Sequence, residues 1–127
     1  IIHAPLNTHT KYLINKDSIS NMKDGVFIIN TGRGGIINTV DVIDGLKSGK
    51  IGALGIDVYE KEKGLFFNDH TMSIPTDDAF ARLLTFKNVL VTGHMAFLTT
   101  NALTSIAHTT IENLNAWKSG QNALNEL

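Results

Sequence analysis

The sequence predicts an α/β fold built on a parallel sheet of the doubly wound type. Short apolar runs rich in β-branched residues alternate along the chain with stretches whose apolar residues recur every three or four positions. The first pattern is typical of buried strands and the second of helices that cover a sheet. With 127 residues, 43% of them hydrophobic, the chain can form the core of one domain.

The first part of the chain predicts two strands separated by a short helix. Residues 1–4, IIHA, have the pattern of the end of a buried strand, and residues 25–30, GVFIIN, that of a complete one. Between them we expect a helix around residues 17–22, with Asn15 or Asp17 as its N-cap. This alternation begins a parallel sheet.

A second helix and two more strands continue the alternation. Residues 39–50 predict a helix with Thr39 as N-cap and Gly49 as C-cap. Strands are expected at residues 51–59, IGALGIDVY, and 88–94, NVLVTGH. The apolar residues of the helix share one face, and these are Val42, Ile43 and Leu46.

The end of the chain predicts a long helix with one continuous apolar face. That face consists of Leu103, Ile106, Ala107, Ile111, Leu114 and Trp117. Before the last strand, residues 60–80 interrupt the alternation and are too long for an ordinary connection. We therefore expect this stretch to be functional or partly disordered.

Composition excludes several functions. The net charge is −1 with both signs dispersed, which does not favour binding to nucleic acid or to an anionic membrane. No segment is apolar for long enough to span a bilayer. The lack of cysteine and of metal-spaced histidines argues against disulfides and a metal site, and agrees with a reducing cytoplasm. Because the chain opens at Ile1, without Met and within a strand pattern, we expect it to be part of a longer protein.

Candidate site residues follow each predicted strand, where ligands gather in open α/β sheets. They are Pro5, the turn Thr31, Gly32 and Arg33, the acids Asp57, Glu60 and Glu62, and Gly93 with His94. Because the carboxyl ends of parallel strands share one edge, an arginine, acids and a histidine should converge there.

Each of these residues has a structural and a functional interpretation. Arg33, among three glycines, fits a turn with a solvated side chain or a guanidinium that binds a carboxylate; the phosphate-loop spacing is missing. His94 fits an inert strand-end residue or a proton donor held by a neighbouring acid. Periodicity does not choose between Glu60 and Glu62, and Asp57 fits either a ligand contact or a backbone cap. The other histidines have weaker cases: His3, His9, His70 and His108.

Four collinear stretches carry a family resemblance: HAPLNTHT, MKDGVFIINTGRGGIIN, LKSGKIGALGIDVYEKEKGLFF and NVLVTGHMAFLT. They resemble the later part of an NAD-dependent D-2-hydroxyacid dehydrogenase, with the lactate branch most similar. The resemblance implies the second half of a doubly wound, Rossmann-like sheet, truncated at its N-terminus. Residues 1–98 would be the C-terminal half of the NAD-binding domain. Residues 99–127 would be the long helix leading back to a substrate domain, which is absent here.

The resemblance also assigns roles to residues. Arg33 matches the substrate-binding arginine, Glu62 the catalytic glutamate and His94 the acid/base histidine. Phe97 matches an aromatic near the substrate methyl group. The family's NAD contacts match Ala4, Pro5, Thr10, Thr31, Gly32, Arg33 and Asp57. Gly32 and Thr10 depart from the common residues at their positions, Ser or Ala and Asn, both on the cofactor side.

The implied activity is hydride transfer between NAD(H) and a small acid, interconverting a 2-oxo acid such as pyruvate and a D-2-hydroxy acid such as D-lactate. The complete protein would be a cytoplasmic homodimer without nucleic-acid or membrane partners. We expect the isolated chain to be inactive, because the glycine-rich pyrophosphate site would lie before Ile1. The alternative is a non-catalytic, nucleotide-binding regulator of the corepressor type.

Overall fold

The structure is a computed structural model that describes residues 1–67 and 76–122. The chain divides into two compact units, Ile1–His94 and Met95–Leu127. The first unit contains, in order, α1 (Lys16–Ser20), β1 (Val26–Asn30), the short 3₁₀ helix η1 (Gly34–Ile36), α2 (Thr39–Ser48), β2 (Ile51–Ile56), α3 (Asp78–Leu84) and β3 (Val89–Val91). The second contains α4 (Thr100–Lys118).

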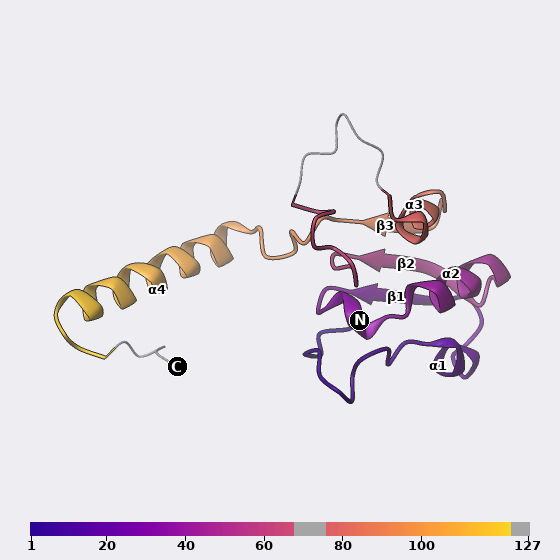
Figure 1. The fold of residues 1–127 in the computed structure, drawn as a ribbon, viewed down its shortest axis with the longest axis horizontal. Helices are drawn as coiled ribbons and strands as arrows, with labels where there is room; N and C mark the ends of the chain where they lie inside the picture. The colour runs from indigo at the N-terminus through magenta and orange to yellow at the C-terminus, as the bar shows by residue number, and fades with distance from the viewer. Residues whose placement is uncertain (68–75, 123–127) are drawn as a thin grey trace. The chain divides into compact units, whose positions relative to one another are not determined.

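The sheet of the first unit is parallel, with strand order β1-β2-β3, and Figure 1 shows β2 between the other two strands. Asn30 pairs with Ile56 and Ile56 with Val91, so the three strands end level with one another. Ile2 forms an isolated parallel bridge to Asn30. The predicted α/β fold is confirmed, while the strand expected at residues 1–4 reduces to this single bridge.

One face of the sheet is buried and the other is open within this unit. Ile28, Leu54 and Ile56 are buried on the face that α2 and α3 cover. On the opposite face, Phe27 is 74% exposed and Leu90 is 68% exposed. The prediction of fully buried strands is therefore wrong for the unit by itself, because side chains alternate between faces and the described helices pack on only one of them.

The helix ends follow local hydrogen-bonding rules. Asn15 caps α1, since its side chain accepts the backbone N–H of Ser18 and the Ser18 hydroxyl accepts the N–H of Asn15. Gly49 ends α2 in the left-handed conformation at φ 77°, as predicted. The predicted N-cap Thr39 is wrong: the cap is Asn38, because its amide oxygen reaches forward into the first turn while Thr39 is already helical and buried.

The helix α3 was not predicted, because residues 60–80 were interpreted as one long connection. Its N-cap is Asp77, whose Oδ1 accepts the Phe80 N–H at 3.0 Å, and Phe80 and Leu83 are buried in the core. An acid followed by apolar residues at helical spacing was the signal for this helix. Residues 60–80 were expected to be functional or partly disordered. Of these, residues 68–75, which include His70, lie outside the described residues.

Asp77 makes stability depend on pH. Burial raises the pKa of its carboxyl, but hydrogen bonds from the Phe80 N–H and the Tyr59 hydroxyl, with the Lys61 ammonium, outweigh burial and hold it below the ordinary value. A carboxyl whose pKa is lower in the folded state stabilises the folded chain at pH values above its unfolded-state pKa of about 3.9. That stabilisation is lost as the pH falls through the folded-state pKa.

We therefore expect Asp77→Asn to lower the free energy of unfolding by at most about 1 kcal/mol at pH 7. The difference from wild type should shrink as pH falls below the unfolded-state pKa of about 3.9 and through the lowered folded-state pKa of Asp77. Urea unfolding of the chain between pH 7 and pH 3 measures it, with Asp78→Asn in the same helical turn as matched control. A difference that is independent of pH would contradict this account.

In the second unit, Thr99 caps α4 through its hydroxyl, which accepts the Ala102 N–H at 3.2 Å. The predicted long helix is confirmed. Within residues 1–67 and 76–122, no helix is sufficiently long and apolar to cross a membrane.

Candidate functional site

The buried amide of Asn30 organises the turn that carries Arg33. Asn30 is fully buried at the end of β1. Its Nδ2 donates to the carbonyl of Arg33 at 3.0 Å, and its Oδ1 accepts the N–H of Gly32 at 3.1 Å. A buried polar group is stable only when it is hydrogen-bonded in this way. Asn30 was not predicted as a site residue, although an amide at the last position of an apolar strand was a signal for it.

Backbone hydrogen bonds join the three strand ends into one edge. The Asp57 N–H donates to the Asn30 carbonyl at 3.0 Å, and the His94 N–H donates to the Asp57 carbonyl at 2.7 Å. Through Asn30, this chain of bonds continues to Arg33. The expected convergence of an arginine, acids and a histidine at the carboxyl edge is therefore present.

His94 and Glu62 form a hydrogen-bonded pair at this edge. Nδ1 of His94 lies 3.0 Å from Oε1 of Glu62, and the two side chains are 31% and 23% exposed. The other carboxylate oxygen, Oε2, accepts the backbone N–H of Tyr59 at 3.0 Å. With Nδ1 directed at Glu62, Nε2 is the imidazole atom that can face a substrate. This is the arrangement of an acid/base histidine oriented by a carboxylate.

Two further observations mark His94. Its backbone has φ 58°, in the left-handed region that few non-glycine residues adopt. Such conformations concentrate at functional sites, where the surrounding structure holds them. The ring of Phe67 lies 6.0 Å from the imidazole, centroid to centroid, and gives it an apolar neighbour.

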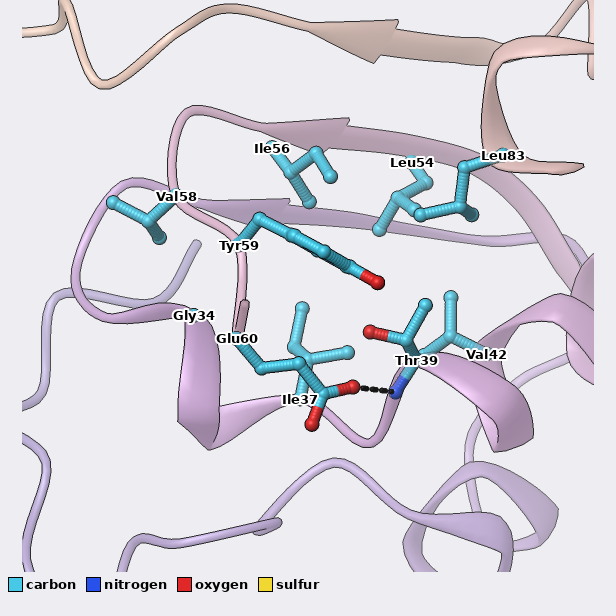
Figure 2. Close-up of a pocket in the computed structure, with 10 residues that line it drawn as sticks. All are labelled: Gly34, Ile37, Thr39, Val42, Leu54, Ile56, Val58, Tyr59, Glu60 and Leu83. Carbon is cyan, nitrogen blue, oxygen red and sulfur yellow. Dashed lines mark hydrogen bonds between the residues drawn. The ribbon is translucent and has the colours of Figure 1, made fainter. Parts of the chain in front are cut away.

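Glu60, the competing acid, has different partners. Its Oε2 accepts the Tyr12 hydroxyl at 2.8 Å, and its Oε1 accepts the Thr39 N–H at the start of α2 at 3.2 Å. Figure 2 shows Glu60 directed at this helix end, beside the ring of Tyr59. Of the two glutamates that spacing left open, the structure places Glu62 against His94.

Arg33 is exposed at the edge, and its Nη1 donates to the carbonyl of Gly32 at 2.9 Å. The next residue, Gly34, lies directly on the backbone of Tyr59 and Glu60. A Cβ at Gly34 would come within 2.0 Å of the Tyr59 carbonyl carbon and within 2.4 Å of the Glu60 nitrogen. Glycine at position 34 therefore allows the Arg33 turn and the Glu62 loop to touch.

Gly34→Ala should destabilise the chain by about 3 kcal/mol, because the clash is with backbone that has no rotamer to change. Gly55→Ala is the matched control, since a Cβ there would meet its nearest atoms at 3.6 Å, an ordinary contact. Thermal unfolding of both variants measures the effect. Equal midpoints for the two variants would show that the two segments are not in contact.

An open hollow of about 600 Å³ lies beside Arg33, within the size range of ligand sites. Its lining residues are His3, Ala4, Pro5, Leu6, Thr31, Gly32 and Arg33. A Cβ at Gly32 would lie only 3.1 Å from the Ala4 carbonyl oxygen, so glycine lets this turn lie close to the backbone of residues 2–4. Backbone groups, a hydroxyl and a guanidinium around this space fit the polar end of a dinucleotide cofactor and the carboxylate of a small acid.

Of the described residues predicted to contact the cofactor, five line this hollow: Ala4, Pro5, Thr31, Gly32 and Arg33. Thr10 instead stabilises the loop between residues 5 and 10, because its hydroxyl donates a hydrogen bond to the Pro5 carbonyl at 2.6 Å. Asp57 is 4% exposed, and its carboxylate accepts the Thr92 hydroxyl. His3, which had a weaker case, lines the hollow, with Nδ1 3.1 Å from the Thr31 hydroxyl. Phe97 belongs to the second unit.

Comparison with known sequences gives consistent matches. The sequence model of the D-isomer specific 2-hydroxyacid dehydrogenase NAD binding domain matches residues 1–96. The D-lactate dehydrogenase of Escherichia coli is 48% identical over 126 residues, which are 99% of this chain and 38% of that protein. The aromatic 2-oxoacid reductase of Clostridium sporogenes is 46% identical over 113 residues, which are 89% of this chain and 34% of that protein.

Solved structures agree with these sequence matches. The structure of the pyruvate reductase of Chlamydomonas reinhardtii superposes with a TM-score of 0.91 at 49% identity, covering 97% of this chain and 38% of that chain. D-Lactate dehydrogenase from Aquifex aeolicus, complexed with NAD and lactic acid, gives a TM-score of 0.80 at 34% identity, covering 93% and 36%.

A parallel α/β sheet with an open hollow and a histidine–carboxylate pair at its carboxyl edge is the arrangement of part of a dinucleotide-binding domain. The chain belongs to the D-isomer specific 2-hydroxyacid dehydrogenase family, within its NAD-binding domain. It spans 34% to 38% of the length of the four relatives above.

Proposed function

We propose that this chain supplies the catalytic half of the NAD-binding domain in a dehydrogenase that interconverts pyruvate and D-lactate. The observation that carries the proposal is the His94–Glu62 pair, with Nδ1 and Oε1 3.0 Å apart, on the same sheet edge as Arg33. The names of the Escherichia coli and Chlamydomonas reinhardtii relatives support pyruvate and D-lactate as the substrate pair.

Each of the three residues has a distinct part in the reduction. The Arg33 guanidinium binds the substrate carboxylate through two parallel hydrogen bonds and so fixes the orientation of the carbonyl. His94 donates the proton on Nε2 to the carbonyl oxygen as negative charge develops there. Glu62 accepts the hydrogen bond from Nδ1, which orients the ring and stabilises the imidazolium. NADH, when bound, supplies the hydride.

The proposal extends to the compartment and the oligomeric state of the whole protein. A chain without cysteine suits the reducing cytoplasm, where we place the enzyme. We propose that the whole protein is a homodimer, the assembly that the family resemblance implies. Sedimentation of the whole protein at several concentrations tests this arrangement.

Steady-state kinetics on the whole protein test the proposed reaction. Oxidation of NADH should be fastest, in kcat/KM, with pyruvate among a panel that includes glyoxylate, hydroxypyruvate and phenylpyruvate. The phenylpyruvate arm matters because a relative 46% identical is named for aromatic 2-oxo acids. A preference for phenylpyruvate would contradict the proposed substrate and leave the reaction class intact.

A further inference from the structure

Glu60 lies outside the proposed chemistry, yet both of its carboxylate oxygens are engaged. Oε2 accepts the phenolic hydroxyl of Tyr12, and Oε1 accepts the backbone N–H of Thr39. The two donors are separated by 27 positions in the sequence, and Glu60 follows both along the chain. The bond to Glu60 also raises the pKa of the Tyr12 phenol above its ordinary value. One side chain therefore joins three segments of the first unit.

The first of these segments is the loop that forms one wall of the cofactor hollow. Residues 3–6 line the hollow, and Thr10 ties this wall to the rest of the loop through the Pro5 carbonyl. Tyr12 lies two residues after Thr10, with φ 50° in the left-handed region, and its N–H donates to the Gly35 carbonyl at 2.9 Å. A non-glycine residue in this conformation needs outside contacts to hold it there.

Residues 31–33 form the opposite wall of the hollow, and the other two segments adjoin this turn. Thr39 is the first residue of α2, and the Arg33 turn and η1 lead into that helix. Gly34 rests on the backbone of Tyr59 and Glu60 themselves. The Glu60 carboxylate therefore connects the 3–12 loop, through Tyr12, to the start of α2, and Figure 2 shows its hydrogen bond to the Thr39 N–H.

We propose that Glu60 is a positioning residue that sets the geometry of the cofactor hollow by fixing Tyr12, and with it the 3–12 loop, against the Arg33 turn. It acts on cofactor affinity and leaves proton transfer to Glu62 and His94. The proposal rests on the proposed function only for the identity of the cofactor, NADH. A residue that merely capped α2 would change stability without changing affinity for a ligand.

Four variants of the whole protein test this role: Tyr12→Phe, Glu60→Ala, the double variant and Glu60→Gln. We expect Tyr12→Phe and Glu60→Ala each to weaken NADH binding about three- to tenfold, as for the loss of one typical hydrogen bond. The double variant should bind as Glu60→Ala does, because both changes remove the same bond. Glu60→Gln should retain most of the affinity, because its amide oxygen can accept the Thr39 N–H while its NH2 group donates to the Tyr12 hydroxyl oxygen. For each variant, kcat for pyruvate should stay within about twofold of wild type.

The affinity is measured by equilibrium fluorescence titration with NADH, and thermal unfolding is followed in parallel. Asp24→Ala is the control, because Asp24 is also a surface acid that holds a partner, Lys50 at 2.7 Å, but precedes β1 at the opposite edge of the sheet. It should leave NADH affinity unchanged. Additive effects of Tyr12→Phe and Glu60→Ala, or a lower unfolding midpoint with unchanged affinity, would overturn the proposal.

Failure of this inference differs from failure of the proposed function. If the wild-type protein binds NADH but does not reduce pyruvate, the proposed reaction is wrong, and the titrations still decide the role of Glu60. If the wild-type protein reduces pyruvate and Tyr12→Phe binds NADH normally, the role of Glu60 alone is wrong. Tyr12→Phe removes a single exposed oxygen, so it gives an answer even where Glu60→Ala does not fold.

Discussion

Arg33→Gln in the whole protein should lower kcat/KM for pyruvate by about 10²- to 10³-fold, a loss of roughly 3–4 kcal/mol. The Asn30 amide holds the backbone carbonyl of Arg33 at the sheet edge, and the guanidinium donates from Nη1 to the Gly32 carbonyl. A glutamine at this position offers one neutral donor where the substrate carboxylate needs two charged ones. KM for pyruvate should rise together with the fall in kcat, because the arginine both binds and orients the substrate.

The matched control is Arg82→Gln. The chain's only other arginine lies on α3, with its guanidinium 5.0 Å from the centroid of the Phe86 ring. We expect this variant to change kcat/KM by less than about twofold, as for a surface substitution away from the site. Near-normal turnover and KM in Arg33→Gln would remove Arg33 from the site.

His94→Gln should lower kcat by about 10³-fold with little change in affinity for NADH, since it removes the proton donor. Glu62→Gln should lower kcat less, by about 10- to 100-fold, because the histidine remains while its orienting charge is lost. The pair acts as one unit through the 3.0 Å contact between Nδ1 and Oε1. The double variant should therefore be no slower than His94→Gln alone.

His108→Gln is the control for this series, since His108 is an exposed histidine on α4. It should leave kcat unchanged. Multiplicative effects of the two single changes, measured in pre-steady-state turnover, would show that Glu62 and His94 act independently and would contradict the pairing.

The sheet was predictable because its signal is local. Runs such as residues 25–30 and 51–56 contain enough β-branched and apolar residues to specify strands, and level strand ends follow from parallel pairing. The extent of burial was not predictable, because it depends on what covers each face. The sequence pattern predicts that the sheet face carrying Phe27 is part of the core, but that face is open in this unit. The helix α3 was missed because seven residues give a weak periodic signal.

The site was predictable in position more than in detail. The rule that ligands gather at the carboxyl edge grouped Arg33 and His94 with the acids Asp57, Glu60 and Glu62. Spacing could not separate Glu60 from Glu62, and only the family resemblance assigned the catalytic role to Glu62. That choice depends on the turn after Tyr59, which directs alternate side chains to different partners, His94 for Glu62 and α2 for Glu60. The role of Asn30 depends on burial, which a single sequence does not reveal.

The most direct test of the central claim uses the whole protein, pyruvate and NADH. The NADH carries deuterium at C4 of the nicotinamide, on the face from which the hydride is transferred. The account predicts D-lactate with deuterium at C2, identified by chiral chromatography and NMR. It also predicts that the product falls with the loss of Arg33 or His94. Formation of L-lactate, or no lactate from a folded protein that binds NADH, would contradict it.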